Sequence, residues 1–67
     1  MECELVFLNP ELKHMISDLS KHEIERIMRK YEGSLATTIT IKAIENEFDL
    51  WCARNNIEKS EYEIVWR

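Results

Sequence analysis

The last seven residues of the chain, 61–67, alternate between apolar and mainly charged side chains. The apolar and aromatic members fall on one face of an extended chain: Tyr62, Ile64 and Trp66. An alternation of period two predicts a half-buried β-strand. Because chain termini usually fray unless the fold ties them down, we expect residues 61–66 to belong to a sheet, with these three side chains facing the helices.

The chain has 67 residues, which is enough for one small core, so we expect a single domain over residues 1–67. A content of 45% hydrophobic residues with one Gly and one Pro is typical of a globular domain. Two cysteines, Cys3 and Cys52, are too few for a disulfide framework. No positively charged segment precedes an apolar run, and a run of four residues such as 5–8, the greatest length found, is too short for a bilayer. We expect a soluble cytoplasmic protein with reduced thiols and no membrane association.

The first half of the chain predicts one strand and two helices. Residues 2–8 alternate and then become fully apolar, which indicates a strand with Cys3, Leu5 and Phe7 on one face. Asn9 and Pro10 form a helix start signal. Two apolar stripes follow, about 110–120° apart around one helix axis. We therefore predict two short helices, 10–19 and 21–32, with Ser20 opening a capping box at their junction, and Gly33 as the stop signal.

The second half predicts a strand, a helix and the final strand. Residues 35–41 include five consecutive β-branched side chains, which favour a strand. The alternative is an early start of the next helix, near Thr37, which would leave Ile39 off the apolar stripe of that helix. From Ile41 onward the stripe is clear and predicts a helix over 42–55, with Phe48 and Trp51 buried. The predicted fold is α+β, with the order β-α-α-β-α-β and a three-stranded sheet packed on helices.

The residue types that carry chemistry do not converge in the sequence. The two cysteines and two histidines lack the spacing of a zinc site. Ser20 and His22 point to different faces of a helix, and a phosphate-binding loop needs more than one glycine. We therefore expect no enzyme activity, no catalytic residue, no cofactor and no metal site.

The patterned surface feature of the sequence is a row of cations on the second predicted helix, which we call the basic ridge: His22, Arg26, Arg29 and Lys30. These side chains lie within about 100° of one another, opposite the apolar stripe. A solvated helix face supported by an ion pair between Glu25 and Arg29 would give the same pattern. The ridge nevertheless contrasts with a net charge of −4 and with acidic residues on the last helix and tail.

Such a bipolar surface suits protein–protein contacts or self-association. We therefore expect a small non-catalytic protein that binds another protein, or itself, through the basic ridge. Its size and acidity are typical of accessory, regulatory or inhibitor proteins, including those of bacteriophages. The alternative is a nucleic-acid-binding regulator that uses helices 10–19 and 21–32 as a helix-turn-helix-like pair, although the net negative charge makes nucleic acid a less suitable partner.

Overall fold

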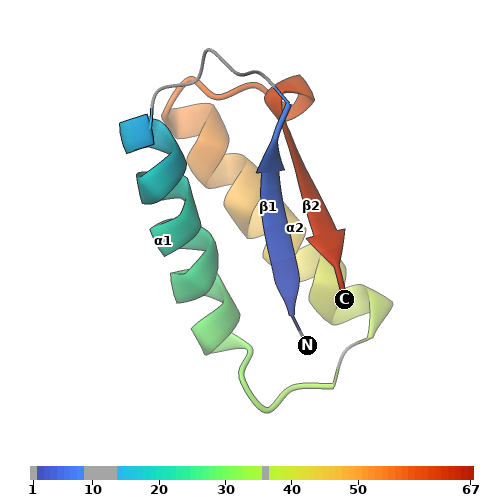
Figure 1. Cartoon of the computed structure of the whole chain (residues 1–67). Coiled ribbons are helices and arrows are strands. Elements are labelled where there is room, and N and C mark those ends of the chain that lie inside the picture. The colour runs from blue at the N-terminus through green and yellow to red at the C-terminus, as the bar shows by residue number, and fades with distance from the viewer. Residues whose placement is uncertain (1, 9–13, 36) are drawn as a thin grey trace.

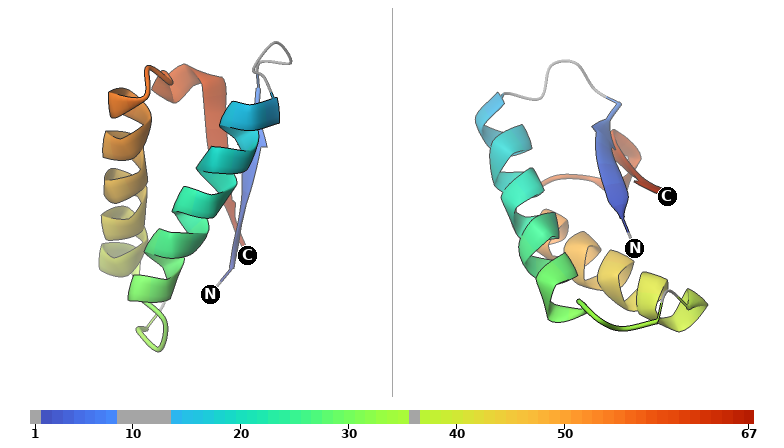
Figure 2. Two further views of the ribbon diagram at one scale, coloured as in Figure 1. Left: turned by 90° about the vertical axis from the view of Figure 1, so that its left-hand side faces the viewer. Right: turned by 60° about the horizontal axis from the view of Figure 1, so that its bottom comes forward.

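The computed structural model describes residues 2–8, 14–35 and 37–67. Its elements follow the order β1 (Cys3–Phe7), α1 (His14–Lys30), α2 (Thr38–Arg54), a short 3-10 helix η1 (Lys59–Glu61) and β2 (Tyr62–Trp66). The two long helices form an antiparallel pair, and the two strands lie together on one side of it (Figures 1 and 2). The fold is therefore α+β, as predicted.

The sheet joins the two ends of the chain. β1 and β2 pair antiparallel, with Leu5 opposite Ile64 in the centre of the ladder. Backbone hydrogen bonds continue this ladder beyond both strands, from the Leu8 amide to the Glu61 carbonyl (2.8 Å) and from the Arg67 amide to the Glu2 carbonyl (2.9 Å). The predicted terminal strand is thus confirmed, and Glu2 and Arg67 lie side by side at one end of the molecule (Figure 1).

The core lies between the inner face of the sheet and the two helices. Its buried apolar members come from β1, both helices, the segment after α2 and β2: Leu5, Ile24, Ile27, Ile44, Phe48, Cys52, Ile57 and Tyr62. Phe48 is fully buried, its ring edge-on to Tyr62 (centroids 5.3 Å apart) and stacked with Trp51 (6.0 Å). The apolar stripe predicted for this helix is confirmed, with Trp51 only partly buried.

The prediction of two helices broken at Ser20 is wrong, because residues 14–30 form one continuous helix. Residues 10–13 of the predicted first helix lie outside the described residues. Ser20 is fully buried, and its hydroxyl donates to the Ile16 carbonyl one turn earlier (2.7 Å) instead of capping a new helix. This bond satisfies the hydroxyl inside the helix, which allows Ser20 to be buried, whereas Leu19, a member of the first apolar stripe of the sequence, is exposed.

The prediction of a strand over residues 35–41 is also wrong, and the alternative of an early helix is correct. α2 begins at Thr38, and the Thr37 hydroxyl caps it by accepting from the Thr40 amide (3.3 Å). Consequently the described sheet has two strands rather than three, and the order of long elements is β-α-α-β. Ile39 is 82% exposed, as the alternative required.

The position of α1 explains why residues 38–41 are helical despite their β propensity. α1 ends at the same end of the molecule at which α2 begins (Figure 1), and Gly33 turns the chain with a φ of +85°, a conformation that glycine adopts without steric cost. A seven-residue strand after this turn would carry the chain about 23 Å toward the opposite end of the molecule, away from the place where α2 begins. Tertiary context therefore decides the conformation of this segment.

Replacing Phe48 with Ala tests the core. Loss of a buried Phe costs about 3–5 kcal/mol, which is comparable to the whole stability of a small domain. We expect Phe48→Ala to be mostly unfolded at room temperature by circular dichroism. Leu50→Ala, on the same helix but 59% exposed, should melt close to the wild type. A cooperative melt of Phe48→Ala near that of the wild type would contradict the assignment of Phe48 to the core.

Candidate functional site

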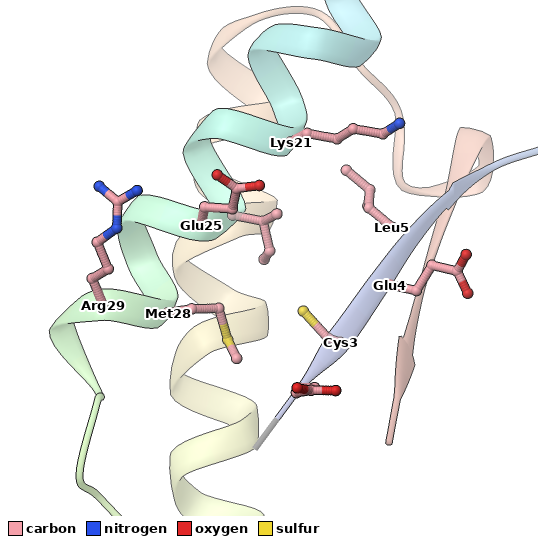
Figure 3. Close-up of a pocket in the computed structure, with 9 residues that line it drawn as sticks. Cys3, Glu4, Leu5, Lys21, Glu25, Met28 and Arg29 are labelled. Atoms are coloured by element: carbon pink, nitrogen blue, oxygen red, sulfur yellow. The ribbon is translucent and has the colours of Figure 1, made fainter.

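An open groove of about 570 Å³ lies between α1 and β1 (Figure 3). Its β1 wall consists of Glu2, Cys3, Glu4 and Leu5. Its α1 wall consists of Lys21, Ile24, Glu25, Met28 and Arg29. We refer to it as the α1–β1 groove. Its two walls are remote in sequence, so the groove exists only because α1 folds back beside the first strand.

The β1 wall presents a strand edge to the groove. The hydrogen bonds of Glu2 and Leu8 with β2 show that even-numbered residues of this segment direct their backbone groups toward β2. In an antiparallel ladder the intervening residues direct their N–H and C=O groups to the opposite edge. Cys3 and Leu5 therefore offer these groups on the groove side. Within the described ranges β1 pairs only with β2.

The floor of the α1–β1 groove is apolar. Ile24 and Met28 lie one turn apart on α1, and Cys3 and Leu5 lie two residues apart on β1, so that each pair points to one face of its element. Figure 3 shows Cys3 and Leu5 directed toward α1 and Met28 directed toward β1, whereas Glu4 points away from α1. The groove thus combines apolar side chains with a strand edge.

Charged side chains of both signs surround this floor. Lys21 reaches from α1 toward β1, and Arg29 points away from β1 on the far side of the helix (Figure 3). On the strand, the Glu4 carboxylate accepts a hydrogen bond from Arg67 (2.5 Å), and both side chains are more than half exposed. The strand wall is therefore acidic on its outer face, and the helix wall carries cations.

The structure divides the basic ridge between two sides of α1. His22, Arg26, Arg29 and Lys30 are all exposed. Arg29 lines the α1–β1 groove, whereas Arg26 binds Glu23 (2.5 Å) and Lys30 binds Glu47 on α2 (2.8 Å). The hydrogen bond from Arg26 lowers the pKa of Glu23.

Two of the four ridge cations are thus engaged within the molecule. The alternative of a solvated helix face invoked an ion pair between Glu25 and Arg29, but the ion pairs of α1 in the described part of the chain are those of Arg26 and Lys30. The ridge is therefore better described as a flank of the α1–β1 groove than as a row of four available cations.

The predicted acidic residues of α2 also have internal partners. Glu45 accepts a hydrogen bond from the Trp66 indole N–H (3.2 Å), and Asp49 pairs with Lys59 (3.5 Å) and accepts a hydrogen bond from Tyr62. These carboxylates anchor β2 and the segment before it to α2. Their acidity therefore has a structural role in holding the terminal strand.

Neither thiol is activated as a nucleophile. Burial raises the pKa of Cys52 from 9.0 to about 11, and partial burial also raises the pKa of Cys3. Burial and the hydrogen bond to Asp49 raise the pKa of Tyr62. A reactive cysteine needs a lowered pKa, so both thiols remain protonated at neutral pH. Across residues 2–8, 14–35 and 37–67, no three His, Cys, Asp or Glu residues are grouped to hold a metal ion.

No single sequence pattern identifies the α1–β1 groove. The residue spacing on α1 predicts Ile24 and Met28 in the core and Arg29 on the surface, and nothing in that spacing places β1 beside them. The fully apolar end of the first strand, residues 5–8, is not a signal for it either, because the groove meets β1 at Glu2–Leu5.

Comparisons with known proteins do not add to this description. No protein-family model, no curated protein and no solved structure matches the chain. Neither α1 nor α2 has the length and apolar character needed to cross a membrane, and this holds for every helix in the described residues.

The raised pKa values predict a loss of stability in alkali. Between pH 9 and about 11 an unfolded chain loses the Cys52 proton while the folded chain keeps it, so the folded state binds more protons and the free energy of unfolding falls as pH rises. One such group lowers the free energy of unfolding by at most about 1.4 kcal/mol per pH unit. Tyr62 adds to the decline at pH values above 10.0, its ordinary pKa.

Urea unfolding at pH 7, 8, 9 and 10 measures this effect. We expect equal stability at pH 7 and 8 and a decline from pH 9 to 10 that is smaller in Cys52→Ala. Equal slopes in the wild type and in Cys52→Ala would show that the thiol is not held protonated by burial.

Proposed function

We propose that this chain is a small non-catalytic protein that acts by binding another protein, and that the α1–β1 groove is its binding surface. The observation that carries this proposal is the β1 edge, whose backbone groups at Cys3 and Leu5 face a groove with an apolar floor. A strand edge of this kind is a ready template for pairing with another chain, and apolar side chains beside it supply contact area.

The small sheet supports the same proposal. Two strands alone are marginally stable in water, and here one face of the pair is supported by helices while its edges remain unpaired within the described residues. A partner that covers the groove would extend the sheet and bury Met28 and Cys3 further. Both are now only partly buried, so binding would remove apolar surface from water.

The basic ridge has a place in this proposal as the flank of the site. Arg29 lines the groove but its side chain points away from β1 (Figure 3), and His22 is exposed on the same helix, so both lie at the outer margin of a partner seated in the groove. Arg26 and Lys30, which bind Glu23 and Glu47, would contribute at the margin. Charges at an interface margin mainly steer association.

A binding role of this kind fits an accessory, regulatory or inhibitor protein of the cytoplasm. Cys3 and Cys52 are both free, as expected in a reducing compartment. The nucleic-acid alternative has no specific observation in its favour. It rested on helices 10–19 and 21–32 as a separate pair, and residues 14–30 form one helix.

Affinity capture from a lysate of the native host tests the proposal with two variants of one residue. Cys3→Trp fills the groove floor with a large side chain, whereas Cys3→Ala leaves it open. We expect Cys3→Ala to retain the protein that the wild type captures and Cys3→Trp to lose at least about tenfold in affinity for it. Circular dichroism verifies that both variants remain folded.

A third variant separates the groove from the ridge. Arg26→Glu combined with Arg29→Glu reverses two ridge cations at exposed positions, and we expect this variant to bind more slowly but still to bind. Retention of the partner by Cys3→Trp, with complete loss in the ridge variant, would move the site to the ridge and refute the groove. Absence of any captured protein specific to the wild type would refute the binding function.

A further inference from the structure

We infer that the partner inserts a short extended segment that pairs with β1 as a third strand, with apolar side chains facing α1 and basic side chains facing out beside Glu2 and Glu4. This inference rests on the proposed function and specifies the chemistry of its partner. Three features of the α1–β1 groove support it: the direction of the backbone N–H and C=O groups of β1, the alternation of the β1 side chains, and the length of β1 that α1 leaves uncovered.

The strand-edge groups set the pairing. Cys3 and Leu5 both direct N–H and C=O groups into the groove, so an antiparallel segment would exchange two hydrogen bonds with each of them. Its residues opposite Cys3 and Leu5 would share their face of the sheet and point toward α1. There they would meet Ile24 and Met28, which requires apolar side chains at these two positions.

The outer face sets the charge of the other positions. A residue opposite Glu4 lies on the exposed face of the sheet, directly beside its carboxylate, and the next outward residue lies opposite Glu2. Opposite charges in such cross-strand positions stabilise a sheet by roughly 0.2–1 kcal/mol, whereas like charges destabilise it. The same face already binds one cation, because Glu4 holds Arg67 from the other side of β1 (2.5 Å). Lys and Arg therefore fit the outward positions.

The course of α1 limits the length of the segment. α1 crosses the sheet obliquely, so that its first turn lies close to the plane of β1 and its last turn lies near α2 (Figure 2). On β1 the groove accordingly reaches only from Glu2 to Leu5. About four residues fit this opening. Read antiparallel to β1, the matching pattern is apolar, basic, apolar, basic.

The arrangement of helices argues against the same edge of a second copy as the occupant. Two β1 edges would pair around a twofold axis perpendicular to the sheet, which keeps the helices of both copies on one face. The second α1 would then overlap the region behind β1, where Ile24, Phe48 and α2 form the core. A single strand without helices on that face, such as an exposed tail or arm of a partner, meets no such obstacle.

A synthetic peptide tests the inference on the full chain. The acetylated, amidated hexapeptide Val-Thr-Ile-Lys-Val-Lys places Ile opposite Leu5 and its first Lys opposite Glu4. In the free protein we expect the amides of Cys3 and Leu5 to exchange with solvent faster than those of Glu4 and Val6, which face β2. On addition of the peptide at millimolar concentration, exchange at Cys3 and Leu5 should slow by at least about tenfold.

Matched peptides make the result specific to strand pairing. N-methyl groups on Ile and the second Val block the edge that faces β1, and this peptide should not protect the two amides. N-methyl groups on the two Lys residues lie on the opposite edge and should leave protection intact. Replacing both Lys residues with Glu should weaken binding at least about tenfold. Equal behaviour of the two N-methylated peptides, or equal affinity of the Lys and Glu peptides, would overturn the inference.

A protein variant gives an independent readout. Cys3→Pro removes the N–H group that faces the groove but no hydrogen bond to β2, as an edge strand tolerates, and it should bind the hexapeptide less than Cys3→Ala does. Protection of Cys3 and Leu5 without peptide, together with a dimer in sedimentation, would overturn the inference in favour of a second copy. Failure of the peptide while a captured host protein still depends on Cys3→Trp would refute the strand but leave the proposed function standing.

Discussion

The pairing of β1 with β2 is the constraint on which the rest of the structure depends. It joins the two ends of the chain and brings Leu5 and Tyr62 together as the surface on which Phe48 packs. It is also the most remote pairing in the sequence, so its loop-closure entropy must be offset by packing against the helices. Hydrogen bonds of Trp66 to Glu45 and of Tyr62 to Asp49 hold β2 to α2, which explains why the apolar tail is ordered.

Sequence patterns predicted the elements whose local preference agrees with their place in the fold. The tail strand, the stripe with Phe48 and the turn at Gly33 are of this kind. Patterns failed where tertiary context opposes local preference. Residues 38–41 favour a strand but begin α2, and Ser20 resembles a helix cap but is buried beside Ile16. The Thr40 amide donates to the Thr37 hydroxyl at the start of α2 instead of to a neighbouring strand. The Ser20 hydroxyl donates to the Ile16 carbonyl within α1 instead of capping a new helix.

The candidate site was less accessible to sequence analysis than the fold. The basic ridge was visible because its four cations lie at helical spacing, but the partners of Arg26 and Lys30 depend on rotamers and on the packing of α2 against α1. The α1–β1 groove depends on the distance between residues 2–5 and residues 21–29, which no local pattern encodes. It also depends on residues 38–41 being helical, so that the described sheet has two strands instead of the predicted three.

The same missing strand connects stability with binding. A two-stranded sheet leaves the chain with little stability to spare, and it leaves the β1 edge beside Ile24 and Met28 open to a partner. A segment that binds only the folded chain stabilises it by mass action, by about 2.7 kcal/mol at a concentration one hundred times its dissociation constant. A partner strand would therefore complete the sheet that the chain alone does not build. Stability and recognition would then arise from one interaction at the β1 edge.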